Sequence, residues 1–132
     1  TNLPPPFYQR YIKERKLIME KAFAYICAAS DAAPRLLKRY CRKVYELGYV
    51  PICPALIEGQ YLTMDNPDDK RDFQNISRQK LGRCRMLVVC GNEITSAMSS
   101  EIGQAEKRNL ICTTLEGLAK IKEADGSAGL SR

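Results

Sequence analysis

Four short apolar runs, each followed by a segment with helical periodicity, are the feature that most constrains the fold of this chain. The runs are AFAYICA at 22–28, YVPIC at 49–53, MLVVC at 86–90 and LICT at 110–113. Short, nearly continuous apolar runs are typical of strands that are buried on both faces of a sheet. Because strands that alternate with helices pair in parallel through right-handed crossovers, the sequence predicts an α/β domain with a parallel sheet.

The segments between the runs carry helix start and stop signals. Helices are expected from the cap at Ser30 or Asp31 to residue 47, and at 67–83, 99–109 and 115–122. Ser30 or Asp31 is the expected N-cap of the first of these, and Gly48 is expected to end it. Pro51 lies inside the second apolar run, and because proline cannot donate to a strand ladder, we expect that strand at or near an edge of the sheet.

The two ends of the chain are expected to lie outside a single domain at 22–124. Residues 1–21 contain three consecutive prolines and then an amphipathic stretch that predicts an extra helix at 7–20. Residues 125–132 predict a flexible tail. The sequence shows neither a signal peptide nor a run near the roughly 20 apolar residues that span a bilayer. We therefore expect a cytoplasmic protein that does not enter the membrane.

Composition narrows the possible chemistry. The chain has six cysteines and no histidine, which excludes mixed Cys/His zinc sites and a catalytic Cys–His pair. We expect buried, free thiols and neither a metal nor another cofactor. The formal charge of +6 permits anionic ligands, and its densest cluster, at 35–43, is suited to an acidic partner. Aromatic side chains are not interleaved with the basic residues in a pattern that suggests the stacking of bases, so nucleic acid is not an expected partner.

Ligands of parallel α/β sheets bind outside the carboxyl ends of the strands, which directs attention to the loops after the apolar runs. Ala28 ends the first run, Ala29 and Ser30 follow it, and their small side chains let a ligand approach the backbone. Gly91 opens the loop after the third run and is another candidate ligand contact. Glu101 follows in the early part of the next helix, where it is either a nucleophile or a carboxylate that stabilises the helix dipole.

Three segments together carry a family resemblance. They are YICAAS, LGYVPICPAL and LGRCRMLVVCGNEITSAMSSEIGQAEKRN, and over about residues 22–115 they resemble the nucleoside 2-deoxyribosyltransferase-like superfamily, more narrowly its small phage and Firmicute members. The most specific piece is E-x-G-x-A at Glu101, Gly103 and Ala105, where the small residues permit close helix packing. The resemblance implies a flavodoxin-like three-layer sandwich with a four- to five-stranded parallel sheet, to which the N-terminal helix is an addition. It also implies a homo-oligomer.

The resemblance also implies roles for particular residues. Glu101 matches the glutamate that attacks the anomeric carbon of a deoxynucleoside, and Tyr25 matches an aromatic residue beside that carboxylate. The implied ligand contacts are Ala28, Ala29 and Ser30, with Ser96, Ser99 and Ser100 at a phosphate site. The enzymes carry an aspartate, which handles the leaving base, in the helix before the third strand. Ser77 stands near that position here, and the nearest acids are Asp72 and Asp69.

Three functions remain open on these grounds. The first is an enzyme that cleaves or transfers the N-glycosidic bond of a nucleoside or its 5′-monophosphate, with Glu101 as nucleophile and Tyr25 as its positioning residue. Such chemistry needs a second acid to protonate the base. The loop carboxylates that remain as candidates are Glu58, Asp65 and Glu93. The second function is binding of a nucleotide-derived ligand without turnover, for sensing or sequestration in phage–host conflict. The third is an interaction module that docks a partner on residues 35–43.

Overall fold

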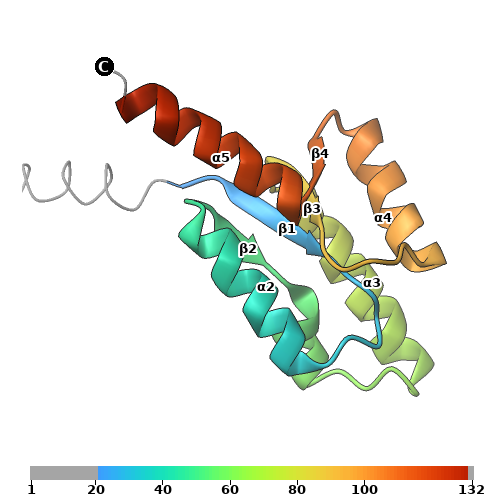
Figure 1. The fold of residues 1–132 in the computed structure, drawn as a ribbon. Helices are drawn as coiled ribbons and strands as arrows, with labels where there is room; N and C mark the ends of the chain where they lie inside the picture. The colour runs from blue at the N-terminus through green and yellow to red at the C-terminus, as the bar shows by residue number, and fades with distance from the viewer. Residues whose placement is uncertain (1–20, 131–132) are drawn as a thin grey trace, which may run out of the picture.

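The fold is organised around a parallel sheet with helices on both faces, in a computed structural model that describes residues 21–130. The elements in chain order are β1 (Phe23–Cys27), α2 (Pro34–Glu46), β2 (Val50–Ile52), the 3-10 turns η1 (Pro54–Leu56) and η2 (Glu58–Gln60), α3 (Pro67–Leu81), β3 (Met86–Val89), α4 (Ser96–Lys107), β4 (Ile111–Thr114) and α5 (Leu115–Leu130) (Figure 1). The helix expected at 7–20 lies outside the described residues. Within residues 21–130, no helix combines the length and apolarity needed to cross a membrane.

The sheet has the strand order β2-β1-β3-β4, and all its pairs are parallel. The predicted α/β fold with a four-stranded parallel sheet is confirmed, and its layers are those of a flavodoxin-like three-layer sandwich. Pro51 lies on β2, which is an edge strand as expected, opposite Ala24 of β1. The chain first adds β2 on one side of β1 and then β3 on the other, so the strand order reverses at β1. Ligands of open parallel sheets bind at such a reversal.

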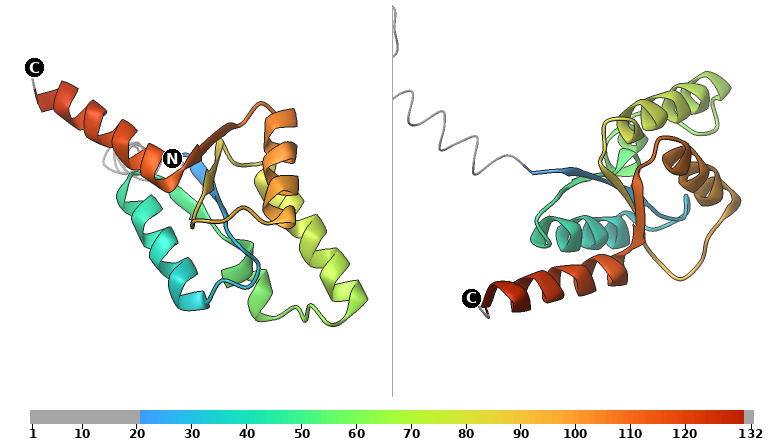
Figure 2. Two further views of the ribbon diagram at one scale, coloured as in Figure 1. Left: turned by 45° about the vertical axis from the view of Figure 1, so that its right-hand side comes forward. Right: turned by 90° about the horizontal axis from the view of Figure 1, so that it is seen from above.

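The two faces of β1 belong to different layers because side chains alternate along a strand. Ala24 and Ile26 pack with residues of α2 and α5, whereas Tyr25 and Cys27 pack with residues of α3 and α4. Figure 2 shows α2 and α5 on one side of the sheet and α3 and α4 on the other. The buried helix residues that complete these two cores include Leu37, Val44 and Leu118 on the first side, and Leu81, Met98 and Ala105 on the second.

The start of α2 differs from the expectation. Its N-cap is Ala33, which makes no side-chain cap, and Pro34 occupies the first turn. Ser30 and Asp31 lie in a turn before the helix, in which Ala32 N donates to Ala29 O at 3.0 Å. The expected N-cap at Ser30 or Asp31 is therefore wrong, because Pro34, with its fixed φ and no N–H to be capped, begins the helix later. The end of the helix is as predicted, since Gly48 has a φ of +102°.

The later helices differ from the prediction mainly at their ends. α4 begins at Ser96 rather than at residue 99 because Thr95 caps it, accepting a hydrogen bond from Met98 N at 3.2 Å. α5 runs to Leu130, beyond the expected end at residue 122 and into the segment for which a tail was predicted. The reason is that residues 115–130 contain no proline; the glycines among them lower helix propensity without blocking the backbone hydrogen bonds.

Candidate functional site

A carboxylate and a phenol meet where the sheet reverses its strand order. Tyr25 lies in the middle of β1, and Glu101 lies in the second turn of α4, which covers that face of the strand. The Tyr25 hydroxyl donates to Glu101 Oε2 at 2.5 Å, and the Tyr25 side chain is almost fully buried. A short hydrogen bond to a carboxylate in a buried setting is among the stronger polar contacts in proteins. It fixes the orientation of Glu101 against the sheet.

Cys27 supplies a second donor to the same carboxylate. Its Sγ lies 3.5 Å from Glu101 Oε1 and 3.8 Å from Met98 O. Cys27 points to the same layer as Tyr25 because the two residues are two positions apart on one strand. Each oxygen of Glu101 is thus approached by one side-chain donor of β1. Cys27 is a site residue that was not predicted, although the two-residue period of the strand places it beside Tyr25.

The three groups differ in how they titrate. Burial raises the pKa of Glu101, and the hydrogen bonds from Tyr25 and Cys27 lower it in part. Burial and then the charge of Glu101 raise the pKa of Tyr25 and that of Cys27, both to values far above neutrality. Tyr25 and Cys27 therefore keep their protons and remain donors at physiological pH. Glu101 is the member of this trio that can lose its proton there.

Ser77 on α3 adjoins the pair but adds no acid. Its side chain is buried, and its Oγ makes no well-formed hydrogen bond within the described residues. It lies near the Tyr25 hydroxyl, where it lowers the Tyr25 pKa against the larger effects of burial and of Glu101. The nearby acids point elsewhere: Asp69 accepts from Thr63 N at 3.0 Å, and Asp72 is exposed. The position predicted for a base-handling acid therefore adjoins Tyr25 but carries a hydroxyl.

The predicted ligand loops lie at the expected end of the sheet. Ala28 and Ala29 directly follow β1 and are half-buried, and Gly91 follows β3 with a φ of +95°. Cys90 N donates to Cys27 O at 2.9 Å, which holds the two loops side by side. The predicted polar contacts are all exposed side chains, namely Ser30 in the turn and Ser96, Ser99 and Ser100 in the first turns of α4. Their role as ligand contacts stays a prediction.

Of the two small residues in the E-x-G-x-A pattern that were predicted to permit close helix packing, one does so and the other does not. Ala105 is fully buried against the sheet, as expected. A Cβ added at Gly103, however, would meet no atom within 4 Å. The expectation that Gly103 permits close helix packing is therefore wrong, because residue 103 lies off the face of α4 that carries Met98 and Ala105.

The three loop carboxylates that are candidates for the second acid lie in different environments. Asp65 and Glu93 are exposed. Glu58 in η2 is 4% exposed, and its Oε2 accepts a hydrogen bond from Lys80 Nζ of α3 at 2.6 Å. Glu58 is thus the one of the three that is built into the protein interior.

The cysteines are free thiols and do not form a metal centre. Within residues 21–130, no three Cys, Asp or Glu side chains gather closely enough to hold a metal ion. Cys112, which we expected to be buried, is exposed because it lies on the edge strand β4. Cys53 is buried, and a hydrogen bond from Cys41 lowers its pKa against the opposing effect of burial.

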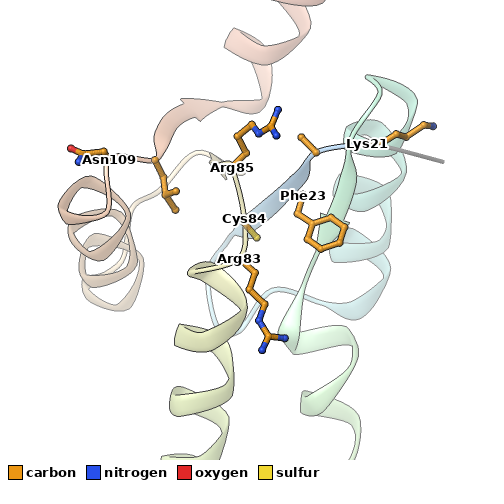
Figure 3. A pocket seen from close by; sticks show the side chains of 8 residues that line it. Lys21, Phe23, Arg83, Cys84, Arg85 and Asn109 are labelled. Atoms are coloured by element: carbon orange, nitrogen blue, oxygen red, sulfur yellow. The ribbon is translucent and has the colours of Figure 1, made fainter. Parts of the chain in front are cut away.

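A shallow pocket of about 420 Å³ lies at the opposite end of the sheet, beside the residues that precede β3 and β4 (Figure 3). Phe23, Arg83, Cys84, Arg85 and Asn109 are among its lining residues, which include no carboxylate. Figure 3 shows the side chains of Arg83 and Arg85 leaving the chain in opposite directions, so the two guanidinium groups do not converge. Because this pocket adjoins the amino ends of the strands, it is separate from the Tyr25–Glu101 pair.

Comparison with known proteins identifies the family of the chain. Residues 22–115 match the model of a domain of unknown function, DUF7768. No curated protein matches the chain in sequence. The matched region begins just before β1 and ends at the start of α5, so it contains the whole sheet together with Tyr25, Ser77 and Glu101. The chain therefore belongs to the DUF7768 family.

Proposed function

We propose that this protein cleaves the N-glycosidic bond of a nucleoside or nucleoside 5′-monophosphate, or transfers its deoxyribosyl group, with Glu101 as the nucleophile. The observation that carries the proposal is the Glu101 carboxylate at the strand-order reversal, with Tyr25 donating to one oxygen at 2.5 Å and Cys27 to the other at 3.5 Å. A half-buried carboxylate held by two neutral donors is oriented without being neutralised by a cation.

In the first step, a Glu101 oxygen forms a bond to the anomeric carbon while the bond from that carbon to the base nitrogen breaks. The base leaves with the bonding electron pair and takes up a proton from solvent water, and the sugar remains as an ester of Glu101. Water, or a second base, then attacks the anomeric carbon and releases the carboxylate. Tyr25 and Cys27 hold the carboxylate in place through both steps. Ser96, Ser99 and Ser100, at the N-terminal end of α4, are the proposed contacts of a 5′-phosphate.

The alternative function is binding of a nucleotide-derived ligand at the same site without turnover. Ser77 favours it, because a buried hydroxyl rather than a carboxyl group adjoins Tyr25 where a proton donor for the leaving base is expected. A protein of this kind would sense or sequester its ligand, and phage–host conflict is the proposed setting.

We also propose that the protein is cytoplasmic, because the reducing conditions of the cytoplasm would keep its six free thiols reduced. We also propose that it forms a homo-oligomer. Large apolar side chains such as Tyr61, Ile94 and Ile111 are more than half exposed, and exposed apolar surface of this kind supports association.

The test combines chromatography with thermal unfolding. The purified protein is incubated with deoxynucleosides, their 5′-monophosphates, and cyclic and ADP-ribose-type nucleotides. We expect release of free base by the wild type and by Glu106→Gln, which alters an exposed glutamate of the same helix, but not by Glu101→Gln. A ligand that raises the melting temperature and is recovered intact would favour the binding function. If no ligand is cleaved and none shifts the melting temperature, the proposal is wrong.

A further inference from the structure

Two of the free cysteines come together from different elements of the fold. Cys41 lies on α2, and Cys53 directly follows β2. Leu37, Cys41 and Val44 are spaced four and three residues apart, so they share the face of α2 that packs against the sheet. Cys41 therefore packs against the buried cluster that contains Cys53. The two thiols lie close enough together for Cys41 to donate a hydrogen bond to Cys53.

The sulfur of Cys53 also faces backbone donors. Cys53 directly precedes η1, and its sulfur accepts from the backbone N–H groups of Leu56 and Ala55. The hydrogen bond from Cys41 lowers the pKa of Cys53 most, burial opposes it, and the two N–H groups lower it further. The same hydrogen bond, together with burial, raises the pKa of Cys41. Cys53 is therefore the thiol of the pair that ionises first, and Cys41 keeps its proton.

The pair lies just beneath the surface of the protein. Cys41 is partly exposed, and Cys53 is 7% exposed. A thiolate is the form of cysteine that reacts with oxidants, and its reactivity also depends on access. Because little of Cys53 is exposed, a small and uncharged oxidant suits this site better than a bulky one.

A third thiol in the same cluster does not share these properties. Cys90 is 2% exposed, and its Sγ donates to Val88 O at 3.6 Å. Burial raises the pKa of Cys90 to about 12, so Cys90 stays protonated. A buried, protonated thiol is inert towards oxidants. The reactive unit in this cluster is therefore the pair formed by Cys41 and Cys53.

We propose that Cys41 and Cys53 form a dithiol that hydrogen peroxide oxidises to a disulfide, with Cys53 as the attacking thiolate and Cys41 as the resolving thiol. The Cys53 sulfur attacks one peroxide oxygen, the O–O bond breaks, and the other oxygen leaves as hydroxide, which takes up a proton. Cys53 is then a sulfenic acid. The Cys41 sulfur attacks the Cys53 sulfur, the S–O bond breaks, and the hydroxyl group leaves with the Cys41 proton as water. The two thiols lose two electrons and two protons, and peroxide is reduced to two water molecules.

The disulfide would join α2 to the turn that follows β2, at the carboxyl end of the sheet. Cys53 is within electrostatic reach of Glu101, whose charge opposes its ionisation. The bond would therefore form near the candidate site. Disulfides in a reducing compartment are usually transient and often sense oxidants, and cellular thiols would reverse this one. The dithiol does not depend on the proposed function, because no step of its chemistry uses the Glu101 site.

The test treats the folded, reduced protein with hydrogen peroxide at low excess. The remaining thiols are then alkylated in denaturant, and tryptic peptides are mapped by mass spectrometry without reduction. We expect the peptide that contains Cys41 to be joined to the peptide that contains Cys53, and both to separate after treatment with dithiothreitol. If both thiols stay reduced while the exposed Cys112 is oxidised, or if the disulfide joins other cysteines, the proposal is wrong.

Three serine variants separate the roles of the two thiols. In Cys41→Ser, Cys53 should accumulate as a sulfenic acid that dimedone labels, because the resolving thiol is absent. In Cys53→Ser, Cys41 should stay reduced at the same peroxide dose. Cys84→Ser replaces a buried thiol of the other core and should form the disulfide as the wild type does. Circular dichroism verifies that each variant is folded. Oxidation of Cys41 in Cys53→Ser, or no label on Cys53 in Cys41→Ser, would contradict the assigned roles.

Discussion

The burial of the ionised Glu101 carboxylate lowers the stability of the folded state, and this bears on the role of the residue. Burial disfavours its ionised form, and the hydrogen bonds from Tyr25 and Cys27 compensate only in part, so the net effect is a raised pKa. A residue kept for stability alone would not be expected to have this environment. Perturbed carboxylates of this kind concentrate at functional sites.

Glu101→Gln is therefore expected to stabilise the protein at pH 7 by about 1 kcal/mol, the size of a typical single-residue effect. A carboxyl group with a raised folded-state pKa contributes stability that is fully present below its unfolded pKa and is lost as the pH rises through the folded value. Glutamine cannot ionise, so it avoids that loss. The stability gained by Glu101→Gln over the wild type should vanish below about pH 4 and should grow as the pH rises towards neutrality. Urea unfolding from pH 4 to pH 8 measures this, and an advantage that is independent of pH would contradict the expectation.

Individual site residues could be predicted from the sequence to different degrees. Glu101 and Tyr25 were chosen from a resemblance, and they form a hydrogen bond in the structure, although their roles stay predictions. Cys27 follows from the two-residue period of β1. The burial of Glu58 could not be predicted, because it depends on how η2 packs against α3, and no local pattern encodes that contact.

At the scale of elements, α4 shows how local signals position the site. Thr95 caps the helix and Met98 anchors its first turn in the core, which brings Glu101 over β1. The strands and the edge position of β2 were predictable because burial and proline chemistry are local in sequence. The starts of α2 and α4 were not, because several capping residues compete within a few positions, and Pro34 and Thr95 prevail.

Two glycines beside the site should respond to alanine in opposite ways. Gly103 is inside α4 with open space around its Cα, so Gly103→Ala should raise the free energy of unfolding by about 0.5–1 kcal/mol. Gly91 has a φ of +95°, and an added Cβ would lie 3.3 Å from the Tyr40 hydroxyl. Gly91→Ala should therefore destabilise the protein by about 1 kcal/mol or more. Urea unfolding measures both, and a destabilising Gly103→Ala would indicate that a ligand or a second copy packs there.

At the scale of the whole molecule, the two central strands carry the core and the edges contribute less. Leu87 on β3 is fully buried, whereas Ile111 on β4 is 55% exposed. Both cores meet at β1 and β3, on opposite faces of the sheet. The site at the carboxyl ends of these strands is therefore supported by the most buried part of the fold.

Leu87→Ala should consequently lower the free energy of unfolding by about 2–5 kcal/mol, through lost burial and the cavity that remains. Ile111→Ala makes a similar truncation on an exposed edge strand, and it should change the free energy of unfolding by about 0.5 kcal/mol or less. Thermal and urea unfolding of the two variants provide the comparison. Similar large losses in both would show that β4 is covered in solution, as by a second copy of the chain.

The most direct test of the central claim is covalent trapping of the sugar on Glu101. A fluorine at C2 of the sugar disfavours the oxocarbenium-like transition states, so a 2-fluoro nucleoside with a good leaving group can accumulate as an ester of the nucleophile. Intact-mass measurement followed by peptide mapping would locate the ester. We predict one added fluorosugar per chain on the peptide that contains Glu101, and none in Glu101→Gln. An adduct on another residue, or no adduct with a nucleoside that the protein binds, would contradict Glu101 as the nucleophile.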